Sequence, residues 1–280
     1  MILSLLRKAI GSSQAAAVAR PAATDERPVA DLMDEARALA AAGEHQAALA
    51  IWGPLAHRGE GRAANNIGAC FLDGLGVERD PAMGLSWLRV AAEAGDPVGM
   101  RNLAAALFQG LGGPEDPVQA FDWYRRAAEA GDVDAMDMLS WMMLEGDAVP
   151  ADHSGAREWA ARAAAAGHGA SMTRLGLIHH HALGVERDPS AAVDWWTRAV
   201  AAGDADGAAM LGAANHLGQG VERDPQRALV LLLLARRGGS RLVETYLPAA
   251  EAGFGAEDRR RAEDVARDIA SRPPWSEVLP

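Results

Sequence analysis

The fold of this chain is decided by the stretch Gly74-Leu75-Gly76-Val77-Glu78-Arg79-Asp80-Pro81. It returns as GQGVERDP at residues 218–225 and, with alanine replacing the first glycine, as ALGVERDP at residues 182–189. Glycine ends helices at little cost, aspartate accepts hydrogen bonds from the free N–H groups of a helix start, and proline suits the first helical position. Each copy therefore predicts a helix end, a turn and a helix start. No lysine follows these glycines and no strand precedes them, so they do not predict a phosphate loop.

Outward from this stretch, the sequence repeats with a period of 36 residues. The same interval separates the members of four columns: Gly59, Gly95, Gly131, Gly167, Gly203 and Gly239; Ile67, Leu103, Leu139, Leu175 and Leu211; Trp87, Trp123, Trp159 and Trp195; and Asp80, Asp116, Asp152, Asp188 and Asp224. Because these columns share one period without an insertion, they predict stacked helix-turn-helix units. We predict that the aspartates are helix N-caps, each worth about 1 kcal/mol, rather than acids or ion ligands. We predict that the four tryptophans form core packing between the units.

Apolar spacing inside each unit supports two helices. Ala63, Ile67 and Phe71 fall at i, i+4 and i+8, which is one face of a helix. The second helix runs to about residue 94, with Trp87 and Ala91 on one side, and Gly95 ends it. The chain is therefore predicted to be all-α, an α/α solenoid of tandem 36-residue helix-turn-helix repeats.

Composition limits the classes of partner. The formal charge is −11, spread along the 280 residues, and this argues against nucleic acid and anionic membrane as main partners, which need a basic footprint. Cys70 is the only cysteine, so no internal disulfide forms, and its apolar column predicts a buried, inert thiol. No recognised catalytic motif or cofactor signature is present. We therefore expect no cofactor and no enzyme activity.

The repeat resembles a known family. The residues that carry the resemblance in the first unit are Ala63, Ile67, Gly68, Gly74, Gly76, Val77, Asp80, Trp87, Ala91, Ala92 and Gly95. Together they are similar to the Sel-one-like repeat, a relative of the tetratricopeptide repeat. The resemblance implies a right-handed superhelix of antiparallel helix pairs and a role as an adaptor in protein complexes. Unit two departs from the pattern at Gly113-Pro114, and unit three at Ala148 and His153, so we expect a different third loop.

The repeats suggest five segments along the chain. We predict a loosely ordered segment over residues 1–28, a tetratricopeptide-like opening repeat over 29–60 and five repeats over 61–239. An incomplete sixth repeat and a capping helix follow over 240–272, and 273–280 is a tail. Residues 1–10 form a weak amphipathic pattern, which leaves membrane contact as an alternative to a floppy terminus. We expect a cytoplasmic protein, with a periplasmic or inner-membrane location as the alternative.

First helices of such units usually line the concave face. Polar or oversized side chains on them, where the repeat does not demand such residues, are the predicted binding surface for a peptide or helix of a partner protein. They are Asn65, Asn66, Arg101, Asn102, Asp137, Trp141, Arg174, His180 and His216. Trp141 stands where other units carry alanine or leucine, and either a partner hot spot or a filled gap would explain it.

A competing hypothesis is a ligand or metal sensor, or an enzyme. It centres on His179, His180 and His181, with His216 in the neighbouring first helix, and on Trp141. Consecutive histidines point in different directions on a helix, however, and no cysteine or carboxylate completes a ligand set. The scaffold is therefore the favoured interpretation, and no metal site is predicted.

Overall fold

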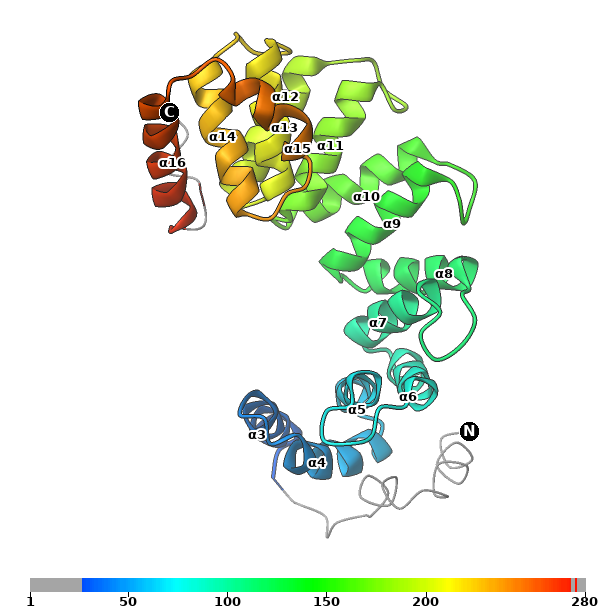
Figure 1. The fold of residues 1–280 in the computed structure, drawn as a ribbon. Helices are drawn as coiled ribbons and strands as arrows, with labels where there is room; N and C mark the ends of the chain where they lie inside the picture. The colour runs from blue at the N-terminus through cyan, green and yellow to red at the C-terminus, as the bar shows by residue number, and fades with distance from the viewer. Residues whose placement is uncertain (1–26, 273–274, 276–280) are drawn as a thin grey trace. The chain divides into compact units, whose positions relative to one another are not determined.

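The computed structural model describes residues 27–272 and Trp275 (Figure 1). The described residues form helices and no strands, which confirms the predicted all-α class. The helices are α3 (Val29–Ala41), α4 (His45–His57), α5 (Gly61–Asp73), α6 (Pro81–Glu93), α7 (Pro97–Phe108), α8 (Pro117–Glu129), α9 (Val133–Glu145), α10 (His153–Ala165), α11 (Gly169–His181), α12 (Pro189–Ala201), α13 (Ala205–Leu217), α14 (Pro225–Arg237), α15 (Val243–Glu251) and α16 (Ala256–Ala270). The predicted amphipathic segment at residues 1–10 and most of both predicted tails lie outside the described residues.

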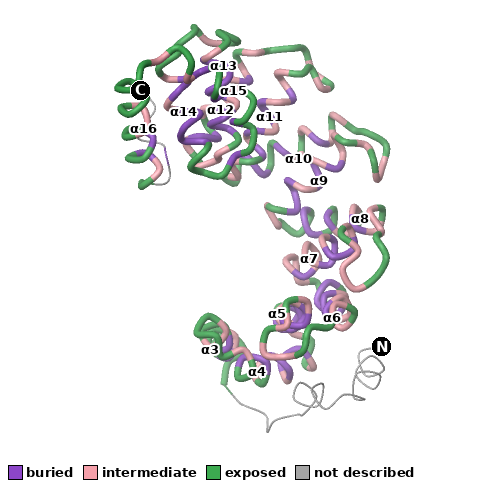
Figure 2. Tube along the Cα trace, viewed as in Figure 1, coloured by how far each residue is buried: buried purple, intermediate pink, exposed green. Residues whose placement is uncertain are grey.

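Helix pairs are the building unit of the fold. Helix α5 packs against α6, α7 against α8, α11 against α12, and α13 against α14. The chain divides into two compact units, residues Met1–Ala135 and Met136–Pro280. Each compact unit has its own core of buried residues, which are purple along the helices in Figure 2. Leu32, Trp52 and Ile67 belong to the core of the first unit, and Trp196 and Leu232 to that of the second.

One arrangement closes every long loop. The N–H of Asp80 donates to the carbonyl of Phe71 at 2.8 Å, and the side chain of Asp80 accepts from the N–H of Met83 at 3.0 Å. The same main-chain bond and the same side-chain cap recur at Asp116, Asp152, Asp188 and Asp224. The third loop, which was expected to differ, is therefore closed in the same way as the others. The aspartates satisfy N–H groups that would otherwise lack a partner at each helix start.

The tryptophan column corrects the prediction of a fully buried core. Trp87 is buried, whereas Trp123, Trp159 and Trp195 are only half-buried, so full burial holds for one of the four. Trp195 still packs against a buried cluster of α10 and α11, as core packing between units requires. An arginine three residues later stacks on each of the three rings, with its guanidinium carbon 4.1–4.7 Å from the ring centre. Trp87 has Val90 at that position.

The residue after this column is buried in each of the five second helices α6, α8, α10, α12 and α14. These residues are Leu88, Tyr124, Ala160, Trp196 and Leu232. A period of 36 residues spans two helices and their loops, so it identifies equivalent residues but does not give the angle between a column and the core. This angle differs between the tryptophans and the residues that follow them, so three of the indoles are half-buried while the residues after them are buried.

The C-terminal helices cover the last repeat. Helix α16 packs against α14, and both Arg236 and Arg237 pair with Glu263 of α16. Ala266 and Ile269 are the buried residues of this helix, whereas Val265 is 47% exposed. Trp275 belongs to the core of this unit, which corrects its assignment to a tail.

The single cysteine lies inside the first unit. Cys70 is 3% exposed on α5, among the residues of the first core. Burial, with a smaller contribution from the nearby carboxylate of Asp73, raises the pKa of the thiol to about 11. The thiolate that reactive cysteines require is therefore scarce near neutral pH.

Candidate interaction surface

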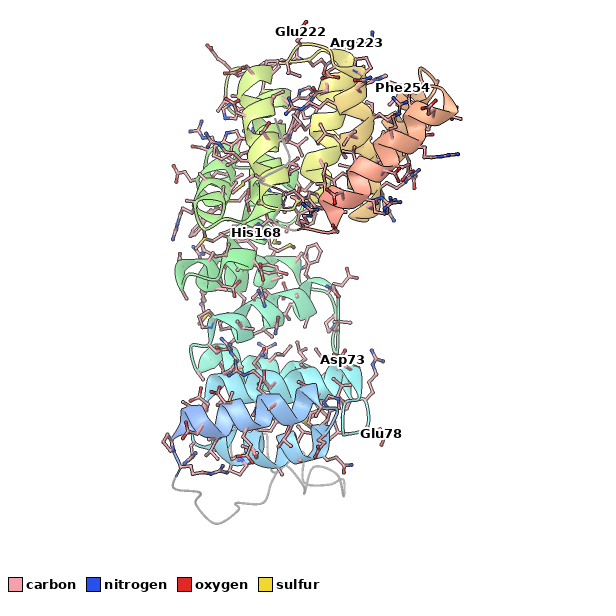
Figure 3. All side chains as sticks on the ribbon, turned by 90° about the vertical axis from the view of Figure 1, so that its left-hand side faces the viewer. Asp73, Glu78, His168, Glu222, Arg223 and Phe254 are labelled. Atoms are coloured by element: carbon pink, nitrogen blue, oxygen red, sulfur yellow. The ribbon has the colours of Figure 1, made fainter. Side chains whose placement is uncertain are left out.

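Each first helix presents a narrow stripe to solvent. On α5 most of the other side chains are buried, and those that reach solvent recur at intervals of three or four residues, so they lie on one face. They are Arg62, Asn66, Ala69 and Asp73, with Leu72 partly exposed beside them, and the equivalent stripe on α7 is Val98, Asn102 and Ala105, followed by Gln109 at the C-cap. Asp73 marks the C-terminal end of α5 in Figure 3. The stripe is the part of a first helix that a partner can reach.

Three asparagines form a chain of hydrogen bonds across α5 and α7. Asn65 is 5% exposed, donates to Oδ1 of Asn66 at 3.2 Å and accepts from Nδ2 of Asn102 at 2.8 Å. The amide nitrogen and the amide oxygen of the buried Asn65 therefore each have a hydrogen-bond partner. Asn66 and Asn102 lie at the two ends of the chain and are half-buried.

The arginines on this face form ion pairs with aspartates of the same compact unit. The guanidinium of Arg62 donates through Nε and Nη2 to Asp96, at 2.8–3.0 Å. The pKa of Arg62 is raised, first by this hydrogen bond and then by the negative charge of Asp96. Arg101 pairs with Asp132 at 3.5 Å and also with Asp134. Both positive charges are thus balanced locally.

An ion pair links α9 and α11 in the second unit. Asp137 is buried and accepts from Nη2 of Arg174 at 2.9 Å and from the hydroxyl of Ser171 at 2.7 Å. Nδ1 of His168 lies 3.8 Å from the same carboxylate. The predicted binding residues Asp137 and Arg174 therefore hold neighbouring helices together. Trp141 on α9 is half-buried.

The histidines do not assemble a metal centre. His180 lies against the buried Trp196, with 5.5 Å between ring centres, and against His181 at 4.7 Å. Nδ1 of His180 and Nδ1 of His216 are buried and have no hydrogen-bond partner among the described residues. Burial, then the charges of His181 and Arg187, lowers the pKa of His180. Over the part of the chain that the structure describes, no three His, Cys, Asp or Glu side chains are placed to hold an ion, so nothing supports the metal-centre alternative.

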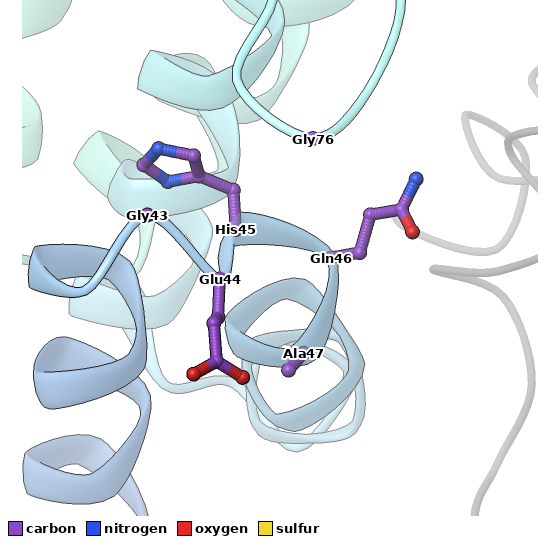
Figure 4. A pocket seen from close by; sticks show the side chains of 6 residues that line it. All are labelled: Gly43, Glu44, His45, Gln46, Ala47 and Gly76. Atoms are coloured by element: carbon purple, nitrogen blue, oxygen red, sulfur yellow. The ribbon is translucent and has the colours of Figure 1, made fainter.

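A hollow lies at the start of α4 (Figure 4). It encloses about 500 Å³ between residues 43–47 and Gly76 of the first long loop. The side chain of Glu44, the residue before α4, accepts no hydrogen bond from the N–H groups at the start of that helix. The lining contains no buried acid–base pair, so the hollow has no evident chemistry of its own.

With this geometry described, comparison with known proteins gives the family. A family model described as Sel1 repeat matches residues 61–96, 97–132, 133–168, 169–204 and 205–240. The chain belongs to the Sel1 repeat family. Sel1 repeat proteins typically serve as scaffolds for protein interactions and are generally not enzymes. No curated protein matches the chain.

Two solved structures share the Sel1 repeat architecture. A Sel1 repeat protein from Oxalobacter formigenes is 30% identical with a TM-score of 0.73, over 84% of this chain and 99% of that chain. The protective antigen c5321 of uropathogenic Escherichia coli, which displays an SLR fold, is 25% identical with a TM-score of 0.69. That match covers 88% of this chain and 56% of the antigen. Among the described helices, none has the length and apolar character that crossing a membrane would need.

The Sel1 repeats also contain a contact that the sequence analysis missed. The arginine of the recurring loop stretch donates through Nε to a carbonyl at the end of the preceding first helix. Arg79 reaches Leu72 at 2.8 Å, Arg187 reaches His180 at 3.2 Å, and Arg223 reaches His216 at 3.0 Å. Arg223 is labelled in Figure 3. Helix ends leave such carbonyls unpaired, so the recurrence of this arginine was the available signal.

Proposed function

We propose that this chain is a scaffold that holds a partner protein on the solvent-facing stripes of its first helices. The observation that carries the proposal is that side chains there depart from what the repeat needs for packing. Asn66 on α5 and Asn102 on α7 are polar amides, Trp141 on α9 is a large ring where the other repeats carry alanine or leucine, and each reaches solvent. Side chains that reach solvent on a rigid framework are candidates for recognition.

The scaffold function that is typical of the family supports this proposal. Hydrogen bonds and ion pairs within the chain reduce the number of residues that are available to a partner. Asn65, Arg101, Asp137 and Arg174 were predicted to bind a partner, but their side chains already bond within the chain. Removing such a residue would disturb packing as well as binding. Asn66 and Asn102 share bonds with Asn65 but also reach solvent, so a loss of binding in their variants is read together with the melting temperature.

Affinity purification with a matched pair of variants tests the proposal. The first variant, Asn102→Ala/Trp141→Ala, changes two first-helix residues. The second, Asp122→Ala/Trp123→Ala, removes an exposed acid and a half-buried indole from the second helix α8. Tagged chains are recovered from the native cells after confirmation by circular dichroism that both variants fold. Mass spectrometry should find a partner that the wild type and the second variant retain and the first loses. Equal recovery of every protein by both variants would exclude the first-helix stripes.

A further inference from the structure

The asparagine chain ends in hydrogen-bonding groups that the protein itself does not use. Asn66 accepts from Asn65 through Oδ1, and its Nδ2 has no partner among the described residues. Asn102 donates to Asn65 through Nδ2, and its Oδ1 likewise has no partner there. Neither atom is among the buried unpartnered polar atoms of the described residues, so both reach solvent. One end of the chain therefore offers a donor and the other end an acceptor.

A polypeptide main chain carries the complementary groups. Each residue other than proline presents one N–H donor and one C=O acceptor, and these groups need partners when a partner protein covers them. We propose that the stripes of α5 and α7 bind an extended segment of a partner protein through its main chain. Asn66 donates to a carbonyl of the segment, and Asn102 accepts from an N–H. This inference rests on the proposed scaffold function and specifies the form of the ligand.

Small side chains beside the two amides leave room for a backbone. Ala69 follows Asn66 by three residues and Ala105 follows Asn102 by three, so each alanine lies next to its asparagine on the same helix face. Both alanines are partly exposed. An alanine methyl group forms no pocket for a ligand side chain. It leaves space for a main chain to approach closely, and the neighbouring amide can then bond to that main chain.

The same positions in the second unit carry a different chemistry. Met138, Arg174 and Met210 occupy the position of the two asparagines, and Trp141, Leu177 and Ala213 occupy that of the alanines, so no amide stands beside Ala213. Arg174 is committed to Asp137. The combination of amide and alanine is therefore confined to α5 and α7, and we restrict the inference to that pair.

Charge does not provide the specificity of this face. Arg62 and Arg101 flank the amides, but Asp96 neutralises the first, and Asp132 and Asp134 neutralise the second. An acidic ligand would have to compete with these internal acids. Neutral hydrogen bonds to the main chain require no such exchange.

Peptides with single main-chain atoms altered test the inference. Random peptides displayed on phage are selected against the full chain, and the dissociation constants of enriched peptides are measured by fluorescence polarisation. Asn66→Ala and Asn102→Ala should each weaken binding about three- to tenfold, the effect of one neutral hydrogen bond. Gln226→Ala, which removes an exposed amide from the second helix α14, outside the stripes, should leave affinity unchanged.

Amide-to-ester substitution along the peptide then removes one N–H at a time. At one position the ester should weaken binding to the wild type by about three- to tenfold, and it should cost nothing further on Asn102→Ala. If a peptide binds but the ester costs the same on both proteins, or neither asparagine variant binds more weakly, the main-chain inference is wrong and the scaffold proposal stands. If no peptide binds the chain at all, this inference and binding of a peptide at the first-helix stripes are both overturned.

Discussion

Replacing Gly176 by alanine tests the closest approach between α11 and α12. The added Cβ would lie 2.2 Å from Nε1 and 2.5 Å from Cδ1 of Trp196, whereas non-bonded atoms settle at about 3.5–4.0 Å. Trp196 is 2% exposed, and its Nε1 donates to the carbonyl of Thr173 at 3.3 Å. The indole must therefore move and weaken this hydrogen bond.

The magnitude follows from three contributions. Overpacking a core costs about 1–3 kcal/mol, and a lost neutral hydrogen bond costs about 1 kcal/mol. Alanine recovers about 1 kcal/mol over glycine inside a helix. Gly176→Ala should therefore lower the free energy of unfolding by about 1–3 kcal/mol.

Urea unfolding followed by circular dichroism measures this change. Gly212→Ala is the matched control at the same repeat position. There the added Cβ would lie 2.9 Å from Cγ of Leu232, a smaller overlap, so the cost should be smaller. In the double variant Gly176→Ala/Trp196→Leu, the combined cost should fall below the sum of the single costs by about 1 kcal/mol or more, because the clash is gone. Unchanged stability of Gly176→Ala, or simple additivity in the double variant, would refute the close packing described here.

Three further predictions concern the caps and the histidines. Ala182, the one described non-glycine residue with positive φ, at 58°, ends α11, so Ala182→Gly should stabilise the fold by about 0.5–1 kcal/mol in thermal unfolding, and Gly218→Ala should do the reverse. Asp188→Ala should cost about 1 kcal/mol and lower the melting temperature, while Asp188→Asn should retain most of the cap. Because the folded-state pKa of His180 lies below its ordinary value of 6.5, the fold should lose stability as pH falls below 6.5, and His180→Leu should show a smaller loss in melts between pH 7.5 and 5.5.

Local signals explain why the architecture could be predicted from the sequence. Caps and turns depend on residues adjacent in the chain, so Asp80 and Pro81 indicate a helix start without knowledge of its neighbours. The position of a column relative to the core depends on how two helices meet. Gly68 shows this, because its missing side chain makes room for Leu88, the buried residue after Trp87. The periodicity alone did not show that this second column lies deeper than the tryptophans.

The candidate surface was only partly predictable for a related reason. Asn65 and Asn66 are neighbours in sequence and were both predicted to bind a partner. In the structure one is buried between two helices, and the other keeps a free donor at the surface. The hydrogen bond from Asn102 makes this difference, and it depends on the distance between α5 and α7, which no local pattern encodes.

The links between first helices constrain how this surface can be altered. The bond between Asn65 and Asn102 and the pair between Asp137 and Arg174 each join residues 37 apart, one more than the repeat. In each link, a residue of one repeat therefore bonds to the residue one place beyond its own equivalent in the next repeat. A substitution at Arg174 would leave the buried Asp137 carboxylate without its cation, at a cost of several kcal/mol, so lost binding there would report on stability. Asn66 holds no buried charge, although its Oδ1 accepts from the buried Asn65. A binding defect in Asn66→Ala that leaves the melting temperature unchanged would therefore separate recognition from packing.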